Sequence, residues 1–421
     1  MDLEAIELHI RNSMREVGRV LLERVLNAQG EGYHGSSIGC KDGHRSRFLE
    51  YRQKEIQTML GPIRLKRSYY YDRKCHSGSC PRDEELGIEH TSFSPGMRRM
   101  MARVGALRPF GQGQEDIQEL AGLQVTAKDI ERISNRLGQE VQRYTGSEAV
   151  MRTMASNVIA FEQIKIFYIC MDGTGVPLVP RELVGRKGKG EDGRARTREA
   201  KLGCIFTQTT VDEGGSPVRD EASTSYVGGI ESAKDFAGHL VLEAKRRGIY
   251  RALQVCVLGD GAEWIWNIVD DRFPGAQQIV DLYHAREHFW ELARAVYSTQ
   301  KERFRAWGRA REEELDRGDV GSVIAAIRRL RPRDKQLQKL CETTIGYYTK
   351  NEHRMRYQEF REKGYFVGSG VLEAGCRTVI GQRLKLSGMH WTVRGANNIM
   401  ALRCCIMSGR WEDFWASRAS A

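Results

Sequence analysis

The sequence predicts an α/β protein in which a sheet domain is interrupted by an all-helical block and preceded by smaller modules. Three observations predict this organisation. Apolar strand-like runs alternate with amphipathic helical segments between residues 161 and 284. Residues 285–364 are helical in pattern and rich in charge. The strand-like runs of the sheet domain all lie before this block. Residues 31–92 are rich in glycine and histidine and then strand-like, which is typical of a small β module.

Composition limits the class of protein. The chain has 421 residues, which is enough for two to four domains. Its 66 Lys and Arg against 55 Asp and Glu give a net charge of +11, which favours a nucleic-acid partner over a protein that is merely basic. No apolar run approaches the roughly 20 residues that span a bilayer. Ten cysteines without an export signal indicate the cytoplasm of a bacterium or archaeon, with association to the nucleoid when DNA is bound.

Residues 1–30 predict one amphipathic helix, because apolar residues recur at helical spacing. The stripe comprises Ile6, Ile10, Met14, Val17, Leu21 and Val25. Two interpretations remain open. The stripe packs on the helix's own domain, or it contacts a second copy of the chain.

The module at residues 31–92 contains two pairs of candidate metal ligands. Cys40 and His44 are four residues apart, and Cys75 and Cys80 follow a strand-like run. Two such pairs can close a tetrahedral zinc site that staples a small domain. A zinc ribbon normally has two Cys-x-x-Cys knuckles, which this segment lacks. The alternatives are therefore a zinc site and a degenerate ribbon without metal.

Residues 93–160 predict a helical region with a helix-turn-helix. A first helix at residues 116–121 ends at Gly122, and Thr126 caps a second helix with Asp129 three residues later. The predicted shared core is Ile117, Leu120, Ile130 and Ile133. The second helix exposes Lys128, Arg132, Asn135 and Arg136, which can reach phosphates or base edges. Helical hairpins that bind no DNA are the alternative.

Three carboxylates stand beside glycines. Asp172 ends the apolar run IKIFYICM, Asp260 ends VCVLG, and Glu373 opens a helix after GSG, in the C-terminal segment 365–421. The sheet segment reads as three strands, a helix, a strand, a helix and a strand, so the first and fourth strands carry the aspartates. Convergent carboxylates in a basic protein predict divalent cations, and two Mg²⁺ ions serve phosphoryl transfer. Together these features indicate a ribonuclease H-like catalytic domain.

Longer motifs carry a family resemblance. They are DGRARTREAKLG, LGDGAEWIWNI, FPGAQQIVDLYHAREH and FVGSGVLEAGCRTVIGQRLKLSGMHWTVRGANNIMALRC. From about residue 60 almost to the C-terminus, the chain resembles the ISKra-type DDE transposases of bacterial and archaeal insertion sequences, which are related to Mutator-like transposases. It departs most at residues 31–80, where the cysteines of a two-knuckle ribbon are missing or respaced.

The resemblance implies roles for particular residues. Asp172, Asp260 and Glu373 would form the metal-binding triad. The pair Asp281 and His284 would act at the reaction site, with a structural histidine as the alternative. Position suggests further contacts apart from the resemblance: Arg377, Arg383 and Lys385 lie on or just beyond the Glu373 helix and could bind DNA phosphates. Trp391 could stack on a base, with packing in the core as its alternative.

The resulting interpretation is a transposase that cleaves the ends of its own element and joins them to target DNA. It would use two Mg²⁺ ions, with Mn²⁺ as a substitute, and would bind terminal inverted repeats and target DNA, as a homodimer. Two other classes remain open. One is a ribonuclease H-like nuclease that only hydrolyses DNA, and the other is a DNA-binding repressor without catalysis.

Overall fold

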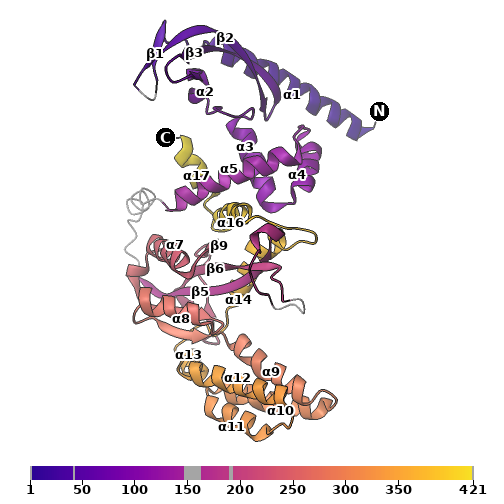
Figure 1. Cartoon of the computed structure of the whole chain (residues 1–421), viewed down its shortest axis with the longest axis vertical. Helices are drawn as coiled ribbons and strands as arrows, with labels where there is room; N and C mark the ends of the chain where they lie inside the picture. The colour runs from indigo at the N-terminus through magenta and orange to yellow at the C-terminus, as the bar shows by residue number, and fades with distance from the viewer. Residues whose placement is uncertain (1, 41–42, 147–162, 189–192, 420–421) are drawn as a thin grey trace. The chain divides into compact units, whose positions relative to one another are not determined.

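A computed structural model describes residues 2–40, 43–146, 163–188 and 193–419 of the chain. The chain forms two compact units, Met1–Leu137 and Gly138–Ala421, and the division falls inside one helix. Figure 1 gives the labels of the helices and strands. Each unit has its own sheet and its own helices, so each is described by itself.

The first unit is built on a four-stranded antiparallel sheet with the order β1-β2-β3-β4. Its strands are β1 (Ser37–Gly39), β2 (Arg45–Thr58), β3 (Gly61–Asp72) and β4 (Ser77–Ser79). Inward-facing Ile56, Ile63 and Leu65 alternate with polar residues and pack with Ile88, just after the short helix α2 (Pro81–Glu85). Alternation of this kind buries one face of an antiparallel sheet.

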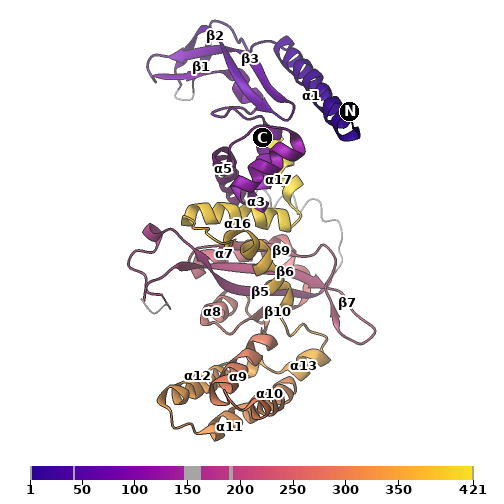
Figure 2. The same ribbon diagram turned by 90° about the vertical axis from the view of Figure 1, so that its right-hand side faces the viewer.

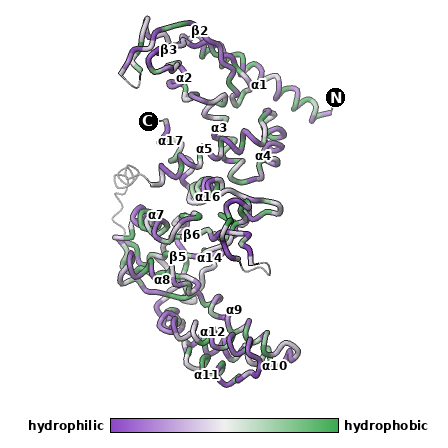
Figure 3. Tube along the Cα trace, in the orientation of Figure 1, coloured by the Kyte–Doolittle hydropathy of each residue, from purple (hydrophilic) through white to green (hydrophobic). Residues whose placement is uncertain are grey.

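Helix α1 (Leu3–Ala28) begins where the Asp2 side chain accepts a hydrogen bond from the Ala5 amide. Leu22 and Leu26 pack against the core of the sheet. The predicted stripe is a different face, and it is exposed, with Met14 at 66% and Leu21 at 60%. Figure 3 shows hydrophobic and hydrophilic residues alternating along α1. The helix thus packs on its own unit, but through residues other than the stripe.

The predicted helix-turn-helix segment is helical, with different phasing in its first helix. After α3 (Pro95–Leu107), α4 (Phe110–Asp116) continues into the π-helical turn η1 (Ile117–Ala121), which ends at Gly122 with a left-handed φ of 66°. Helix α5 (Ala127–Gly146) follows, and Thr126 accepts a hydrogen bond from the Asp129 amide, as predicted. Leu120 was predicted in the core but is 79% exposed, because the wider π turn rotates it away from the α-helical face.

The second unit contains a five-stranded mixed sheet with the order β11-β10-β5-β6-β9. Its strands are β5 (Ile164–Pro177), β6 (Thr197–Gln208), β9 (Ser225–Gly229), β10 (Ala252–Gly259) and β11 (Gln277–Val280). Strands β10 and β11 run parallel to β5, and β6 runs antiparallel to both of its neighbours, as the central sheet in Figure 2 shows. A short hairpin, β7 (Thr210–Val211) with β8 (Pro217–Val218), lies between β6 and β9 in the chain.

Both faces of this sheet are covered by helices. A Cβ added to Gly203 of β6 would meet Phe236 and Leu240 of α7 (Ala233–Arg246), so α7 covers that face together with its neighbour α8 (Glu263–Arg272). The adjacent Leu202 points to the opposite face, towards α14 (Gly370–Gly375) and α16 (Val393–Met407). The π-helical η5 (Cys376–Gly381) and α15 (Gln382–Leu384) follow α14 directly.

The charge-rich block is helical, as the sequence predicts. It comprises α9 (Leu282–Val296), α10 (Lys301–Asp316), α11 (Val320–Leu330), α12 (Lys335–Asn351) and α13 (Tyr357–Glu362). The chain then returns through α14 to the sheet and ends in α17 (Trp411–Ala419). Among the residues that the structure describes, no helix has the length and apolar character to cross a bilayer.

Candidate active site

Asp172 and Asp260 occupy equivalent positions on neighbouring parallel strands. In the register of β5 and β10, Met171 lies opposite Gly259, so the two aspartates are the next pair along. Asp172 also lies opposite Leu202 in the antiparallel pairing with β6, and paired residues point to the same face. Leu202 faces Gly375, which carries the chain out of α14. Asp172 therefore emerges on the face that α14 covers, and Asp260 follows the end of the neighbouring strand closely enough for its charge to act on Asp172.

The carboxylate of Asp172 is half-buried and has two hydrogen-bond donors. Its Oδ1 accepts from the Gly173 amide at 2.6 Å, and its Oδ2 accepts from the Cys376 thiol at 3.2 Å. Burial raises the pKa of Asp172 above its ordinary value, and the hydrogen bonds from Cys376 and Gly173 lower it in part. The nearby negative charge of Asp260 raises the pKa further. His284 acts in the opposite direction, so it belongs to the same electrostatic environment. The site favours a cation.

Asp260 is held by the turn that links β10 to α8. Its Oδ1 accepts from the Ala262 amide at 2.8 Å, and its carbonyl oxygen accepts from the Tyr347 hydroxyl at 3.1 Å. Gly261 has a φ of 99°, and a Cβ there would lie 2.7 Å from the Tyr347 ring. Glycine is therefore required both by the backbone and by the approach of α12. The ring of His288 lies against the same tyrosine, 3.8 Å between centroids.

Glu373 lies in α14 with an exposed side chain. Cys376, three residues later, contacts Asp172, so the helix that carries Glu373 docks directly on the first aspartate. The three carboxylates are not a group whose ligand atoms all lie within 4.8 Å of one another; among described residues that distance is met only by a cluster in the first unit. Like charges hold carboxylates apart unless cations lie between them.

Asp281 has a structural position. It is fully buried, and as the N-cap of α9 its Oδ1 accepts from the His284 amide at 2.9 Å. Its Oδ2 accepts from the amide of Ser369, the residue that precedes α14. The prediction of a reacting group is therefore corrected: both oxygens of Asp281 are used to hold the starts of two helices. Asp281 is a positioning residue.

His284 has a half-exposed side chain, and its Nδ1 lies 3.3 Å from Glu287 Oε2. Its backbone amide is fixed by Asp281, and its electrostatic effect reaches Asp172. The histidine thus lies close enough to Asp172 to act on its charge, and its ring can be approached from solvent.

Two predicted DNA contacts are corrected by burial. Arg383 is completely buried, with its guanidinium 4.9 Å from the Trp391 ring centroid. Trp391 is 8% exposed and donates to the Leu384 carbonyl at 3.1 Å. The two side chains pack against each other inside the second unit, and Trp391 is bonded to the end of α15. Lys385 is exposed and donates to Thr174 on β5, and Arg377 is exposed on η5.

The predicted recognition helix presents its basic residues to solvent, though they have partners. Lys128 pairs with Glu131 at 2.9 Å, and Arg132 pairs with Asp129 at 3.0 Å. Asn135 donates to the carbonyl of Glu131 at 3.0 Å. Arg136, one helical turn after Arg132, is exposed. Such exposed pairs are worth less than about 1 kcal/mol and exchange readily for phosphate contacts.

The predicted metal ligands of the first unit are only partly brought together. Cys40, His44 and Cys75 converge, and the fourth member of the group is Asp72 in place of Cys80. Cys80 lies at the N-cap of α2, beyond the β4 strand that returns along β3. The hairpin therefore carries Cys80 away from the turn that holds Cys75.

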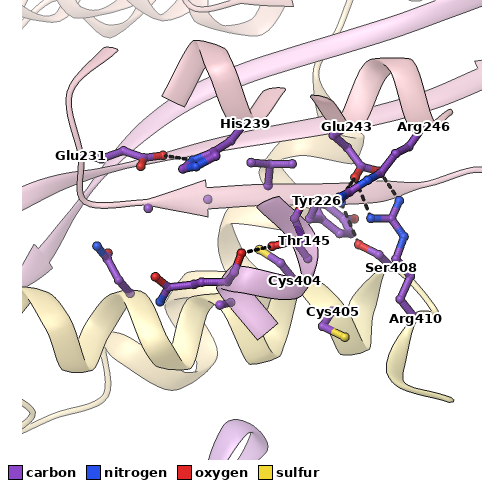
Figure 4. Close-up of a pocket in the computed structure, with 16 residues that line it drawn as sticks. Thr145, Tyr226, Glu231, His239, Glu243, Arg246, Cys404, Cys405, Ser408 and Arg410 are labelled. Carbon is purple, nitrogen blue, oxygen red and sulfur yellow. Dashed lines mark hydrogen bonds and ion pairs between the residues drawn. The ribbon is translucent and has the colours of Figure 1, made fainter. Parts of the chain in front are cut away.

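A separate pocket lies at the β9 edge of the second sheet, where it is lined from both α7 and α16 (Figure 4). It has a cavity volume of about 130 Å³, and neither the aspartates nor Glu373 line it. Glu243 on its wall accepts from Arg410 at 2.6 Å, with Arg246 and Arg247 each 3.7 Å away. Burial works against ionisation, yet Arg410 holds the pKa of Glu243 below its ordinary value. These charges satisfy one another, so the pocket is part of the internal packing.

Two residues of the site were not predicted. Cys376 binds Asp172, and Tyr347 binds the backbone of Asp260 from α12. Cys376 carries a signal in the sequence, because it lies three residues after Glu373 and so on the same helical face. Tyr347 carries none, since its contact depends on how the helical block folds back on the sheet.

Known proteins resemble the chain at a distance. Residues 1–174 match the model of a family described as "Uncharacterised protein family (UPF0236)". The "UPF0236 protein in vanSb 3'region" of Streptococcus gallolyticus is 20% identical over 368 residues, which are 86% of this chain and 74% of that protein. A solved structure, "Drosophila P element transposase strand transfer complex", aligns with a TM-score of 0.34 and 8% identity over 78% of this chain and 95% of that one. Such a score does not establish a common fold.

Proposed function

We propose that the protein is a DDE transposase that cleaves the ends of a DNA element and joins them to target DNA. The observation that carries the proposal is the nearness of two carboxylates: Asp172 lies on β5, Asp260 directly follows the paired strand β10, and the charge of Asp260 acts on Asp172. The Glu373 helix docks on Asp172 through Cys376. The aspartates belong to the first and fourth strands of the five-stranded sheet in chain order. A late helix supplies the third acid, which is the arrangement expected of a ribonuclease H-like nuclease or transposase.

The donor set fits Mg²⁺. The three acids offer only oxygen ligands, and Asp172 and Asp260 place two negative charges near each other. Asp172 and Asp260 would hold the ions between them, and Glu373 would complete one coordination sphere. Bound Mg²⁺ supplies Lewis-acid polarisation of a phosphoryl oxygen and stabilises a developing negative charge. Mn²⁺, with similar ligand preferences, would substitute.

The chain's own residues position the reacting groups. In the first step the oxygen of water attacks the phosphorus of a phosphodiester, and the 3′-oxygen leaves and is protonated. In the second step the oxygen of that 3′-hydroxyl loses its proton and attacks the phosphorus of a target phosphodiester, and the 3′-oxygen of the target strand leaves and is protonated. The half-exposed His284 lies near Asp172 and would bind a phosphate or hold a proton beside the cut. Lys385, bonded to Thr174 two residues beyond Asp172, would bind a phosphate.

A basic hollow beyond the end of β5 supports binding of the DNA backbone. It is lined by Arg186, Arg194, Arg196 and His390, with Leu178 at its base. In the first unit, Lys128, Arg132, Asn135 and Arg136 would contact a terminal repeat. Arginine-lined surfaces of this kind bind phosphates without reading sequence.

A homodimer is part of the proposal, because a transposase must hold two DNA ends at once. The exposed stripe of α1 supports it. Leu3, Ile6 and Ile10 recur eleven residues later as Met14, Val17 and Leu21, and all six are more than 40% exposed. An eleven-residue repeat drifts only slowly around a helix, so two copies can pair along the stripe with a slight right-handed supercoil.

The test is an assay of cleavage and joining with purified protein, Mg²⁺ and DNA that carries the flanking ends of its own element. Three proteins are compared: wild type, Asp260→Asn and Asp271→Asn. Asp271 is the matched control, because it is an exposed aspartate on α8 that pairs with Arg272. New 3′ ends joined to target, absent only with Asp260→Asn, are expected.

Other outcomes identify the rival functions. Nicks without joined products would identify a nuclease. Equal DNA binding by all three proteins, with no cleavage, would identify a DNA-binding protein without catalysis. Cleavage by Asp260→Asn at the wild-type rate would remove Asp260 from the site and overturn the proposal.

A further inference from the structure

Two turns of the first unit meet at one end of its sheet. One links β1 to β2 and contains Cys40 and His44, and the other links β3 to β4 and contains Cys75. Strand β2 begins at Arg45 and β3 ends at Asp72, and the antiparallel register places these two ends together. Residues some thirty positions apart in the chain are thereby brought to one place.

The side chains at this end converge on a common point. Cys40 Sγ lies 3.6 Å from Cys75 Sγ, and His44 Nδ1 lies 2.9 Å from the same sulfur. Asp72 Oδ2 lies 3.6 Å from Cys75 Sγ and 4.0 Å from His44 Nδ1. All four ligand atoms lie within 4.8 Å of one another. Donors held at zinc–ligand distances around a tetrahedron stand roughly 3.3–3.8 Å apart.

We propose that Cys40, His44, Asp72 and Cys75 bind one zinc ion. Two thiolates, an imidazole and a carboxylate suit Zn²⁺ better than Mg²⁺ or Ca²⁺, which prefer oxygen ligands alone. Four protein ligands leave no open position, so the site is structural and not catalytic. It lies in the first unit and is independent of the proposed chemistry at Asp172.

The carboxylate of Asp72 is already oriented for this role. It is buried, and its Oδ1 accepts from the Lys74 amide at 2.7 Å and the Cys75 amide at 3.3 Å. These bonds leave Oδ2 directed at the cysteine and histidine. Hydrogen bonds that fix a ligand in advance strengthen metal binding.

The ion has a structural task at this end of the sheet. The three residues of β4 are all exposed, and no residue of β1 is fully buried, so apolar packing contributes little to either strand. A zinc ion would connect the β1–β2 turn to the β3–β4 turn and hold both outer strands on the long central hairpin. Metal binding in such a module contributes directly to folding stability.

The experiment measures zinc in the full-length protein, purified without chelator, for wild type and four single variants. Metal content is determined by mass spectrometry, and affinity by competition with a chromophoric chelator. Cys75→Ser and Asp72→Asn remove ligands. His44→Ala removes an exposed ligand, so it tests the site without disturbing buried packing. Cys80→Ser is the matched control, a half-buried cysteine of the same unit outside the group.

One zinc ion per chain is expected in wild type and in Cys80→Ser. Cys75→Ser should lose the ion, and His44→Ala should bind it at least about 10-fold more weakly, since even outer-shell changes have effects of that size. A chelator should lower the thermal stability of wild type and leave Cys75→Ser unchanged. Equal loss of zinc in Cys80→Ser, or a Cys40–Cys75 disulfide in place of bound metal, would overturn the proposal.

Discussion

Neutralising Asp260 should stabilise the second unit in the absence of divalent ions. Asp172 and Asp260 are register neighbours on strands about 4.8 Å apart. Two unit charges at about 5 Å repel by about 3 kcal/mol at an effective dielectric constant of 20. Both carboxylates are partly exposed, and solvent and salt reduce this to about 1 kcal/mol. Asparagine at position 260 keeps the oxygen that accepts from the Ala262 amide, so the turn is preserved.

The order of stability should reverse when Mg²⁺ is added. An ion at 100 times its dissociation constant stabilises the native state by about 2.7 kcal/mol. Wild type should gain this increment, and Asp260→Asn should gain little of it because a ligand is missing. Thermal unfolding with and without Mg²⁺ measures the effect, and about 1 kcal/mol corresponds to about 1–2 °C in a unit of this size, because the entropy of unfolding is about 2.1 cal/mol/K per residue. Asp271→Asn, with a side chain 70% exposed, should follow wild type in both conditions.

Two results would refute this reasoning. If Asp260→Asn is less stable than wild type without divalent ions, the carboxylates do not repel one another as their register requires. If Mg²⁺ raises the unfolding temperature of Asp260→Asn as much as that of wild type, then Asp260 is not a ligand, whatever the protein does to DNA.

Two further predictions concern packing and assembly. Arg410→Met should lower the free energy of unfolding of the second unit by about 3–5 kcal/mol, measured by urea unfolding. The reason is that it removes the closest cation from the buried carboxylate of Glu243. A loss below about 1 kcal/mol would show that the neighbouring arginines are enough to stabilise that carboxylate. Met14→Glu should convert a dimer to a monomer in sedimentation, whereas Asn12→Glu, off the α1 stripe, should not; an unchanged dimer would exclude the stripe as its interface.

The sequence predicted those parts of the site that depend on local patterns. Apolar runs before Asp172 and Asp260 predicted two strands, and the structure pairs them in parallel. The predicted end of the first strand at Asp172 is wrong, because pairing with β6 carries β5 on to Pro177. The capping of α5 by Thr126 was likewise readable, because a cap requires only a few neighbouring residues. The sequence could not predict the approach of Tyr347, which depends on the folding of a separate helical block.

Two of the errors have a common physical cause. Leu120 was placed in the core by assuming α-helical spacing, and Arg383 was interpreted as a DNA contact on or just beyond the Glu373 helix. Both lie in or after a π-helical turn, η1 or η5, and such a turn adds a residue to the helical repeat. Every side chain beyond it then faces a direction that the 3.6-residue period does not predict. Sequence periodicity carries no sign of the extra residue, so the sequence alone could not show which way these side chains face.

Asp281 was predicted to act at the reaction site, but its side chain holds the helices that carry other site residues. Its spacing to His284 is that of an N-cap to the third helical residue, and its side chain accepts from that amide. The other oxygen holds Ser369, so one buried carboxylate fixes the start of α9 and the start of α14. His284 and Glu373 extend from these two helices. A shift of the helical block would therefore move His284 and Glu373 together, because Asp281 connects the starts of both helices. The block thus helps to position these residues and is not merely an insertion beside them.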